Sequence, residues 1–542
     1  MDGRDAVKGR RLGWLVLGGV PLVFLAYFFV YPLVTIVATA LSSRGDGAQI
    51  GEVLASSSLR GVVWFTTWQA VVSTVLTLLV GIPGAHVIAR FAFRGRKLIR
   101  ALTVVPFVLP TVVVGSAFLA LLGPRGVLGV DLSRSVLAIV LAHVFFNYAV
   151  IVRTVGSFWE GLDPRIEDAA RALGASRWQT FRSITLPLLA PSIAAASSIV
   201  FLFTFTSFGI VLILGGVENA TIEVEIWRQA IGLLDLRVAA VLALLQLGGI
   251  ALLLWWYTRT QAGSRQLRTS AGHRRRPHGA ERVFLASNLL FMAALLGAPV
   301  VVMLWRSIAG PDGLSLVAYA DLGVREPASA LFVPALDAIG NSLRFALTAT
   351  VLAVIVGAAA AAIVAYRPGP IGRTFDIMLM LPLGTSAVTL GFGFLVALDA
   401  PIDLRTWPWL IPIAHALVAI PFVVRTTVPV MRRVQVRLRE AAATLGASPA
   451  RAWREVDLPL VARAVLVGAG FAFAVSLGEF GATSFIARPD APTLPIAIFR
   501  LLGQPGTLTF GRAMALSVIL MVLTALAVLA IERLRPEGGD GF

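Results

Sequence analysis

The 542-residue sequence contains no cysteine, and this absence excludes disulfide bonds, thiolate metal sites and cysteine nucleophiles. Charged residues are scarce at 14% of the chain, whereas 57% of the residues are hydrophobic. Because a soluble core of this length needs far less apolar surface, the composition indicates a membrane protein. Acids are the scarcer charge, with 29 Asp and Glu against 46 Lys and Arg, so the formal net charge is +17.

A positive net charge is also typical of nucleic-acid-binding proteins, but the positions of the arginines argue against that class. They fall in short gaps between apolar runs of about twenty residues, as the positive-inside rule expects of a membrane protein. The chain also lacks a Gly-x4-Gly-Lys-Ser/Thr phosphate loop, so it is not expected to bind and hydrolyse ATP in the usual way. We therefore expect no nucleic-acid partner and no cofactor in this chain.

Apolar runs long enough to cross a bilayer recur twelve times, which predicts an all-α membrane protein with about 12 transmembrane helices. The first run is too long for the apolar region of a secretory signal and is interpreted as a retained helix. The runs lie near residues 13–41, 61–90, 101–122, 136–156, 191–215, 237–257, 283–306, 340–365, 375–397, 408–428, 463–485 and 512–531.

Basic clusters precede the odd-numbered runs, and this predicts that those gaps and both termini face the cytoplasm. The most polar stretch, 259–282, predicts a solvated linker that is either a plain connector or a contact for anionic lipid or a regulatory tether. It separates a first six-helix unit at 1–258 from a second at 283–542. The opposite gaps are more acidic, and one of them contains Glu218, Glu223, Glu225 and Asp235.

The two predicted units carry the same motifs at a fixed offset of 272 residues. Each unit holds six runs, an even number, so the units should have the same orientation and be related by a pseudo-twofold axis along the membrane normal. The repeated motifs are Leu109-Pro110 and Leu381-Pro382, Ala142-His143 and Ala414-His415, Leu173-Gly174-Ala175-Ser176 and Leu445-Gly446-Ala447-Ser448, and Phe208-Gly209 and Phe480-Gly481.

One repeated motif lies between the fourth and fifth runs of each unit. It predicts a short alanine-rich helix, a glycine break, and a second amphipathic segment that ends at a proline where the next membrane helix starts. Such a helix-turn-helix can fit a groove on another protein, and an interfacial helix without a partner is the alternative. Its residues are Asp168, Ala169, Ala170, Gly174, Leu186 and Pro187 in the first copy and Glu440, Ala441, Ala442, Gly446, Leu458 and Pro459 in the second.

This spacing resembles EAA-x3-G-x9-I-x-LP, the cytoplasmic loop signature of ABC importer permeases, although Asp168 replaces the glutamate in the first copy. The resemblance implies a permease subunit in a bacterial cell membrane that is not itself an enzyme. It implies that the two loops dock on two copies of an ABC ATPase subunit, which would bind ATP and Mg²⁺, and because the loops are unequal the ATPase pair could be homodimeric or heterodimeric. It also implies that an extracytoplasmic substrate-binding protein delivers cargo to a pathway with alternating access.

The resemblance extends over nearly the whole chain and is closest to fused two-repeat permeases of the thiamine and ferric-iron type. The stretches 68–70, 141–147, 214–216 and 220–223 look like the thiamine permease. The stretch 476–481, by contrast, is shared with iron, molybdate and sulfate relatives. The resemblance therefore implies thiamine or its phosphates as cargo. Ferric iron is the alternative, and sulfate, molybdate or a polyamine fits less well.

Glu479 is the acid inside the run at 463–485, where burying a charge costs roughly 2.5–3.5 kcal/mol or more. A carboxylate in the pathway would suit a cationic cargo such as thiamine, whereas pairing with an arginine or capping a helix break is the alternative. Its repeat counterpart is Ser207. Phe208 and Phe480 follow these two residues and are either an aromatic gate or helix packing, so the four residues are the candidate pathway residues.

His143 and His415 recur at matched positions without a second histidine or a carboxylate at helical spacing, which predicts interhelical hydrogen bonds rather than metal ligands. Two other classes of protein stay open at this point. An ion-coupled secondary transporter would normally need more intramembrane carboxylates than Glu479. A membrane enzyme would need a clustered acid pair, a histidine set or a nucleophile motif.

Overall fold

The computed structural model describes residues 17–42, 50–124, 126–127, 129, 131–216, 218–261, 274–310, 313–325, 331–367, 369–400, 402–433 and 436–534. Within these residues, ten helices are long and apolar enough to cross a membrane, and two further helix pairs meet that test together but are bent by 100° and 93°. Counting each bent pair as one span gives twelve spans. The prediction of an all-α membrane fold with about 12 transmembrane helices is therefore confirmed.

The first bend falls at its Leu-Pro pair, and the second falls just after the repeated pair. Leu109 has extended backbone, and Pro110 separates the helix that ends at Val108 from the helix that begins at Thr111. A proline has no N–H to donate and pushes the preceding residue out of helical geometry, so the chain turns there. In the second repeat Pro382 lies in the last turn of the first helix, which ends at Gly384, and the next helix begins after Ser386, whose side chain caps it.

The chain separates into two compact units. Unit 2 comprises Gly51–Glu225 and Leu245–Leu316, and unit 1 comprises Met1–Ile50, Ile226–Leu244 and Val317–Phe542. The elements of unit 2 are α4 (Ser57–Arg90), α5 (Arg96–Leu102), α6 (Val105–Val108), α7 (Thr111–Leu122), α8 (Val136–Glu160), α9 (Pro164–Ala172), α10 (Arg177–Thr180), η2 (Phe181–Thr185), α11 (Leu186–Phe205), α12 (Gly209–Leu214), α15 (Ala280–Ser307), β1 (Ala309–Gly310) and β2 (Gly313–Leu314).

The elements of unit 1 are η1 (Ala26–Val30), α2 (Tyr31–Leu41), η3 (Arg228–Gly232), α16 (Val317–Ala320), η4 (Asp321–Gly323), α17 (Asp337–Tyr366), α18 (Pro370–Gly384), α19 (Ala387–Ala397), α20 (Leu410–Arg433), α21 (Val436–Thr444), α22 (Pro449–Ala452), η5 (Trp453–Asp457), α23 (Leu458–Gly478), α24 (Thr483–Ile486), α25 (Leu494–Leu502) and α26 (Thr507–Leu534). Three elements have residues in both units, namely α3 (Ile50–Ala55), α13 (Ile222–Trp227) and α14 (Leu236–Gln261).

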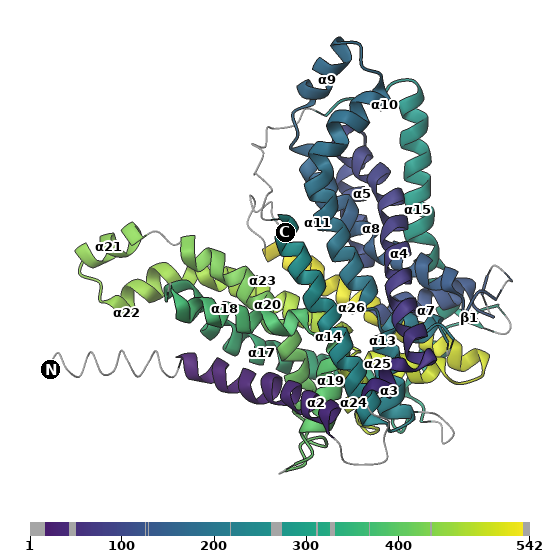
Figure 1. Cartoon of the computed structure of the whole chain (residues 1–542), viewed down its shortest axis with the longest axis vertical. Helices are drawn as coiled ribbons and strands as arrows, with labels where there is room; N and C mark the ends of the chain where they lie inside the picture. Colours follow the sequence, from purple (N-terminus) through teal and green to yellow (C-terminus); the bar gives the residue numbers. More distant parts are fainter. Residues whose placement is uncertain are drawn as a thin grey trace. The chain divides into compact units, whose positions relative to one another are not determined.

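In unit 2, α4, α8 and α11 lie side by side, and α9 and α10 project at one end of them (Figure 1). Ile151, Leu189 and Val200 are among the fully buried residues of their shared core. α4 and α8 approach closely at Gly84, where a Cβ atom would lie 2.0 Å from the Tyr148 hydroxyl oxygen. A larger residue at this crossing would therefore have to displace the buried Tyr148 ring.

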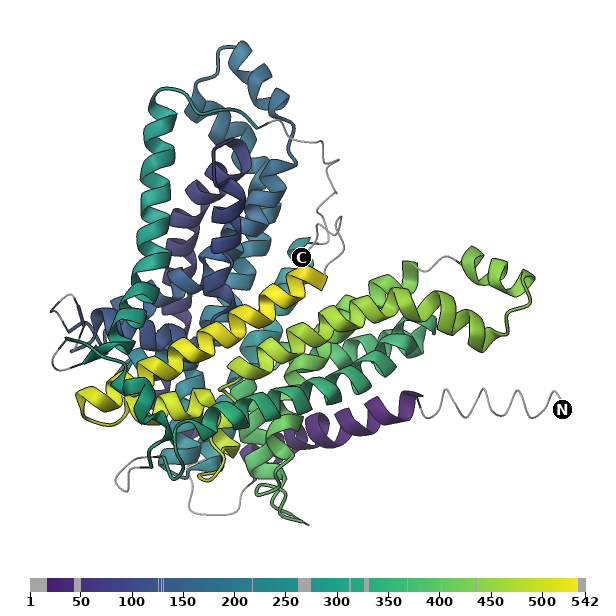
Figure 2. The same cartoon turned by 180° about the vertical axis from the view of Figure 1, so that it is seen from behind.

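Unit 1 repeats this arrangement with α17, α20 and α23, and α21 and α22 project at one end of the helices (Figure 2). A close approach occurs here between α20 and α23. A Cβ atom at Gly468 would lie 2.6 Å from Thr426 Oγ1 and 2.9 Å from Val423 Cα. Small residues at helix crossings let the backbones come close, which is how membrane helices gain packing energy.

The first membrane helix of each sequence repeat lies in the unit that holds most of the other repeat. In unit 1, α2 packs against α19, and the rings of Phe28 and Phe394 are 6.3 Å apart. In unit 2, α15 packs against α7, and Met292 joins a buried cluster with Ile88 and Tyr148. The predicted division into 1–258, 259–282 and 283–542 follows the sequence repeats and does not coincide with compact units 1 and 2. It stays a prediction.

The helices that follow the two repeated alanine-rich motifs run through their prolines, so the predicted end of the second amphipathic segment at each proline is wrong. Residues 177–205 and 450–478 each form one continuous helix. A π-turn, η2 or η5, precedes the Leu-Pro pair in each, and in both turns an N–H bonds the carbonyl five residues earlier. Because Pro187 and Pro459 cannot donate to the carbonyl four residues back, the wider turn keeps the helix unbroken.

Candidate functional site

The first EAA loop, residues 163–187, is built around α9. The Asp163 side chain caps its amino end, and the helix closes in a Schellman motif in which the Ala175 N–H donates to the Ala170 carbonyl at 3.1 Å. This motif needs one residue in the left-handed region, and Gly174 has φ of +90°. The glycine of the sequence motif is thus required by the backbone.

The second EAA loop, residues 436–459, has the same backbone. α21 closes with a hydrogen bond from the Ala447 N–H to the Ala442 carbonyl at 2.9 Å, and Gly446 has φ of +81°. The three-residue spacing between the second alanine and the glycine therefore places the glycine at the left-handed position of the helix end. The predicted short helix and glycine break are confirmed in both loops.

Both EAA loops expose most of the predicted motif residues. The backbone turn also exposes one leucine in each loop, because Leu173 is 90% and Leu445 is 88% exposed. Large apolar side chains exposed on a projecting loop indicate a surface that another molecule covers. Sequence reasoning noted these leucines only as part of the repeat. Asp168, Ala169, Gly174, Leu186, Pro187, Glu440, Ala441, Gly446, Leu458 and Pro459 are exposed, whereas Ala170 and Ala442 are half-buried.

In unit 2, a buried histidine lies beside the break between α11 and α12. His143 Nε2 is 2.8 Å from the Ser207 hydroxyl oxygen in the break, and His143 Nδ1 is 3.1 Å from the Ser73 hydroxyl oxygen on α4. The ring therefore links α8 to α4 and to the break. The prediction that His143 forms interhelical hydrogen bonds is confirmed.

In unit 1, His415 lies beside the break between α23 and α24. Its Nδ1 is 2.7 Å from the Ser476 hydroxyl oxygen and its Nε2 is 2.8 Å from the Thr483 hydroxyl oxygen. The prediction is confirmed for His415 as well. Unlike His143, this histidine also meets a carboxylate, because its Nε2 is 3.2 Å from Glu479 Oε2.

The carboxylate of Glu479 is engaged by groups of its own unit. It accepts the N–H of Ala482 at 2.7 Å and of Thr483 at 3.0 Å, and it also accepts the Thr483 hydroxyl. Glu479 is 6% exposed. This geometry matches the alternative in which Glu479 caps a helix break, with a histidine as the nearby base.

The other three candidate pathway residues are buried as well. Ser207 and Phe208 are each 6% exposed and lie in unit 2, whereas Phe480 is 2% exposed and lies in unit 1. The rings of Phe480 and Phe499 are 5.5 Å apart, which is the packing geometry of two phenylalanines. A place in the translocation pathway stays a prediction for these residues and for Glu479.

Two of the acids in the gap between the membrane helices that end at Phe205 and begin at Leu236 are buried rather than exposed to solvent. Glu223 and Glu225 lie on α13 and are 0% and 3% exposed. Glu223 Oε1 accepts a hydrogen bond from Gln246 Nε2 on α14 at 2.9 Å. The sequence carried a signal for this burial, because the two acids alternate with isoleucine, valine and tryptophan between residues 222 and 227.

The described end of the basic linker, residues 274–282, is tied to unit 2. The backbone of Arg275 exchanges hydrogen bonds with the ends of α4, accepting from Ala92 at 2.9 Å and donating to Arg90 at 3.1 Å. Hydrogen bonds to Glu281 hold the pKa of Arg275 above its usual range. Glu281 also lies 3.4 Å from Arg177 of the first EAA loop, so the linker reaches that loop.

A cavity of about 360 Å³ lies between this linker end and the first EAA loop. Its lining includes the rings of His86, Trp159 and Phe181 and the arginines Arg177 and Arg275. The residues from 262 to 273, which complete the predicted linker, lie outside the described residues.

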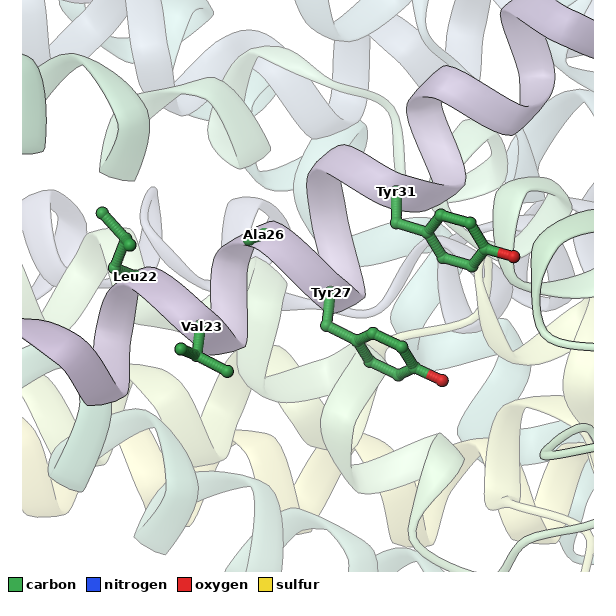
Figure 3. A pocket seen from close by; sticks show the side chains of 5 residues that line it. All are labelled: Leu22, Val23, Ala26, Tyr27 and Tyr31. Carbon is green, nitrogen blue, oxygen red and sulfur yellow. The ribbon is translucent and has the colours of Figure 1, made fainter. Parts of the chain in front are cut away.

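A shallow hollow of about 350 Å³ lies on the first helix of unit 1 (Figure 3). Its lining is Leu22, Val23, Ala26, Tyr27 and Tyr31, and the two tyrosine rings are stacked with centroids 5.9 Å apart. Because this helix is long and apolar enough to cross a membrane, hydrocarbon chains of the bilayer are a sufficient cover for the hollow.

Residues 77–262 and 353–537 each match the family model described as the binding-protein-dependent transport system inner membrane component, with one match in each sequence repeat. The chain is 29% identical over 538 residues to the thiamine transport system permease protein ThiP of Brucella abortus (strain 2308), covering 94% of both chains. It is 28% identical to the protein of the same name from Escherichia coli (strain K12), covering 88% of this chain and 89% of the relative.

A further relative matches a smaller part of the chain. The sulfate transport system permease protein CysT of Escherichia coli (strain K12) is 31% identical over 220 residues. The match covers 39% of this chain and 79% of that protein.

Proposed function

Because the chain belongs to the family of binding-protein-dependent transport system inner membrane components, we propose that it forms the translocation pathway of an ATP-driven importer for thiamine or its phosphates. One observation supports thiamine as the cargo. The relatives that match the chain along nearly its whole length are named as thiamine permeases, whereas the sulfate permease matches 39% of it. Ferric iron remains the second candidate, on the resemblance of the stretch 476–481.

Two copies of an ABC ATPase subunit are the proposed partners at the EAA loops. The loops have matched backbones, and each exposes a leucine at its turn, so two identical ATPase subunits have two similar surfaces to bind. The chain contributes no phosphate loop. In this proposal ATP and Mg²⁺ are bound by the partner, and this chain is not an enzyme and needs no cofactor of its own.

The proposed orientation follows the positive charges. Arginines gather on and near both EAA loops, so the loops and both termini face the cytoplasm of a bacterial cell. A substrate-binding protein then delivers cargo at the opposite face. ATP binding closes the ATPase pair and moves the EAA loops, and the resulting movement of the membrane helices exposes the pathway to each side in turn.

The test is uptake into vesicles that contain this chain, its cognate ATPase and its binding protein. We expect labelled thiamine to enter only with ATP, and we expect Gly446→Asp to lower uptake because it adds a charged side chain to the exposed turn of the second EAA loop. Uptake of ferric iron but not thiamine would support the proposed importer function and contradict thiamine as its cargo. Uptake that needs an ion gradient and no ATPase would overturn the importer in favour of a secondary transporter.

A further inference from the structure

We propose that each EAA loop is joined to the membrane helices by a node of three side chains, and that these residues position the loop so that its movement reaches those helices. The first node is Arg90, Glu167 and Thr185, and the second is Tyr366, Arg439 and Asp457. The inference rests on the proposed docking of an ATPase on the loops, and it assigns a role to residues outside the EAA motif.

In the first node, Glu167 of α9 is held from two sides. The Arg90 guanidinium, at the last residue of α4, lies 3.0 Å from Glu167 Oε1 and also donates to the Leu162 carbonyl at 3.2 Å. The Thr185 hydroxyl, at the last residue of η2, donates to the same Glu167 oxygen at 3.0 Å. One carboxylate therefore ties the EAA helix to the end of α4 and to the start of α11.

In the second node, Arg439 of α21 takes the central position. Its Nε lies 2.9 Å and 3.0 Å from the two carboxylate oxygens of Asp457, the last residue of η5. Its Nη2 donates to the hydroxyl of Tyr366, the last residue of α17, at 3.3 Å, and its guanidinium lies 5.2 Å from the centre of that ring. Hydrogen bonding to Asp457 raises the pKa of Arg439.

The two nodes join the same three places in the fold. Glu167 and Arg439 are equivalent by the repeat offset, and so are Thr185 and Asp457. Each node contains one cation, one carboxylate and one hydroxyl, but different elements supply them. The EAA helix supplies the carboxylate in the first node and the cation in the second, and the π-turn supplies the hydroxyl in the first node and the carboxylate in the second. The long helix supplies the cation in the first node and the hydroxyl in the second, and the carboxylate moves from the EAA helix to the π-turn.

Burial makes each node a fixed joint. Thr185 is 3% and Asp457 is 2% exposed, and the side chain of Arg90 is 8% exposed. Moving the loop away would leave a charged group out of water without its partner, which is strongly unfavourable. By contrast, the faces of the loops that carry Leu173 and Leu445 are exposed. A pull on the exposed face is therefore transmitted through the node to α4 and α11, or to α17 and α23.

The experiment measures ATP hydrolysed per thiamine imported by the reconstituted complex, together with co-purification of the ATPase and thermal unfolding. Glu167→Arg places a second cation against Arg90, and we expect the ratio to rise at least fivefold while the ATPase still co-purifies. The triple change Arg90→Tyr, Glu167→Arg and Thr185→Asp installs the second node's arrangement in the first loop. We expect it to return the ratio to within twofold of wild type.

Two milder variants keep the proposal testable if the triple variant does not fold. Arg439→Lys retains the charge but loses the two-pronged contact with Asp457, and we expect the ratio to rise about threefold. The matched control is Arg405→Gln, which removes an exposed two-pronged pair with Asp403, 2.9 Å at both contacts, and should leave the ratio unchanged.

The outcomes separate the two proposals. If wild type imports thiamine with ATP but Glu167→Arg and Arg439→Lys keep its ratio, the nodes do not position the loops. A triple variant that folds but couples no better than Glu167→Arg would also overturn the node. If wild type itself shows no ATP-dependent uptake, the proposed function fails instead.

Discussion

The first and second EAA loops have the same backbone but are held by different side chains. In both loops the first helix closes with a left-handed glycine. The short second helix then continues through a π-turn into a long membrane helix. The ties behind that backbone differ, because a glutamate stands at position 167 where an arginine stands at 439. Glycine and proline therefore fix the shape of a loop, whereas the charged residues that anchor it can come from different elements in the two repeats.

The same contrast recurs at the breaks in the helices that follow the loops. The break in unit 2 holds His143 with the hydroxyl of Ser207, and the break in unit 1 holds His415 with the carboxylate of Glu479. Position by position, the second repeat therefore places a buried acid where the first has a hydroxyl, both at the break and at the end of the π-turn.

The largest expected difference between the repeats is at the two histidines. His415→Ala leaves a 6% exposed Glu479 without its base and should destabilise the protein by about 3 kcal/mol, whereas His143→Ala leaves hydroxyls and should cost about 1–2 kcal/mol. Thermal unfolding in detergent measures both. Adding Glu479→Gln to His415→Ala should recover part of the loss, and equal losses for the single variants would show that Glu479 carries no charge.

The glycines test whether the two loop backbones are equivalent. Gly174→Val and Gly446→Val should each cost about 1–2 kcal/mol and lower uptake roughly tenfold, because valine resists the left-handed region. A Cβ meets nothing within 4 Å at either position, so the effect is one of backbone conformation. Gly174→Asn and Gly446→Asn are the controls and should retain most uptake, since asparagine tolerates this region. A large difference between the two valine variants would contradict matched loops.

A smaller difference concerns the serines that begin α10 and α22. Ser176 forms a capping box, in which the Gln179 N–H donates to its hydroxyl oxygen at 3.2 Å and its own N–H donates to Gln179 Oε1 at 2.8 Å. Ser448 accepts from the Arg451 N–H at 3.3 Å, and arginine cannot accept in return. Ser176→Ala should therefore cost about 1 kcal/mol and Ser448→Ala less. Hydrogen exchange of the first-turn amides measures this, and the reverse order would contradict the capping box.

The smallest effect is expected at the acidic position of the motif. Asp168 pairs with Arg171 at 3.0 Å, and its side chain is 67% exposed. Asp168→Glu restores the motif and should raise ATPase binding to the first loop about twofold, since exposed pairs contribute roughly 0.2–1 kcal/mol. Glu440→Asp should lower binding to the second loop by a similar factor. The affinity of the ATPase for each variant, measured at two salt concentrations, tests both predictions. If neither variant changes the affinity, the acid is not part of the docking surface.

The sequence predicted the features that depend on local composition. Apolar length located the membrane helices, and the repeated glycine located the helix end in both loops, because hydropathy and left-handed backbone are properties of the residues themselves. Glu440 and Asp168 were likewise found on exposed loops as the spacing predicted.

Contacts between distant residues were not predictable in this way. Hydropathy gives the length of a helix but not its neighbours, so the pairing of α2 with α19 left no trace in the pattern. Glu479 meets His415 from 64 residues away, and no helical spacing relates the two. The π-turns replaced an expected break, because a proline was judged by its missing N–H alone and not by the wider turn that accommodates it.

The pairing of α2 with α19 also sets an order for synthesis. α2 precedes unit 2 in the chain, but its neighbour α19 follows the whole of unit 2 and is made only after it. Unit 2 can therefore close while translation continues, whereas unit 1 must wait for its last helix, α26. A chain that stops at the linker would therefore leave α2 without the helix that it packs against in unit 1.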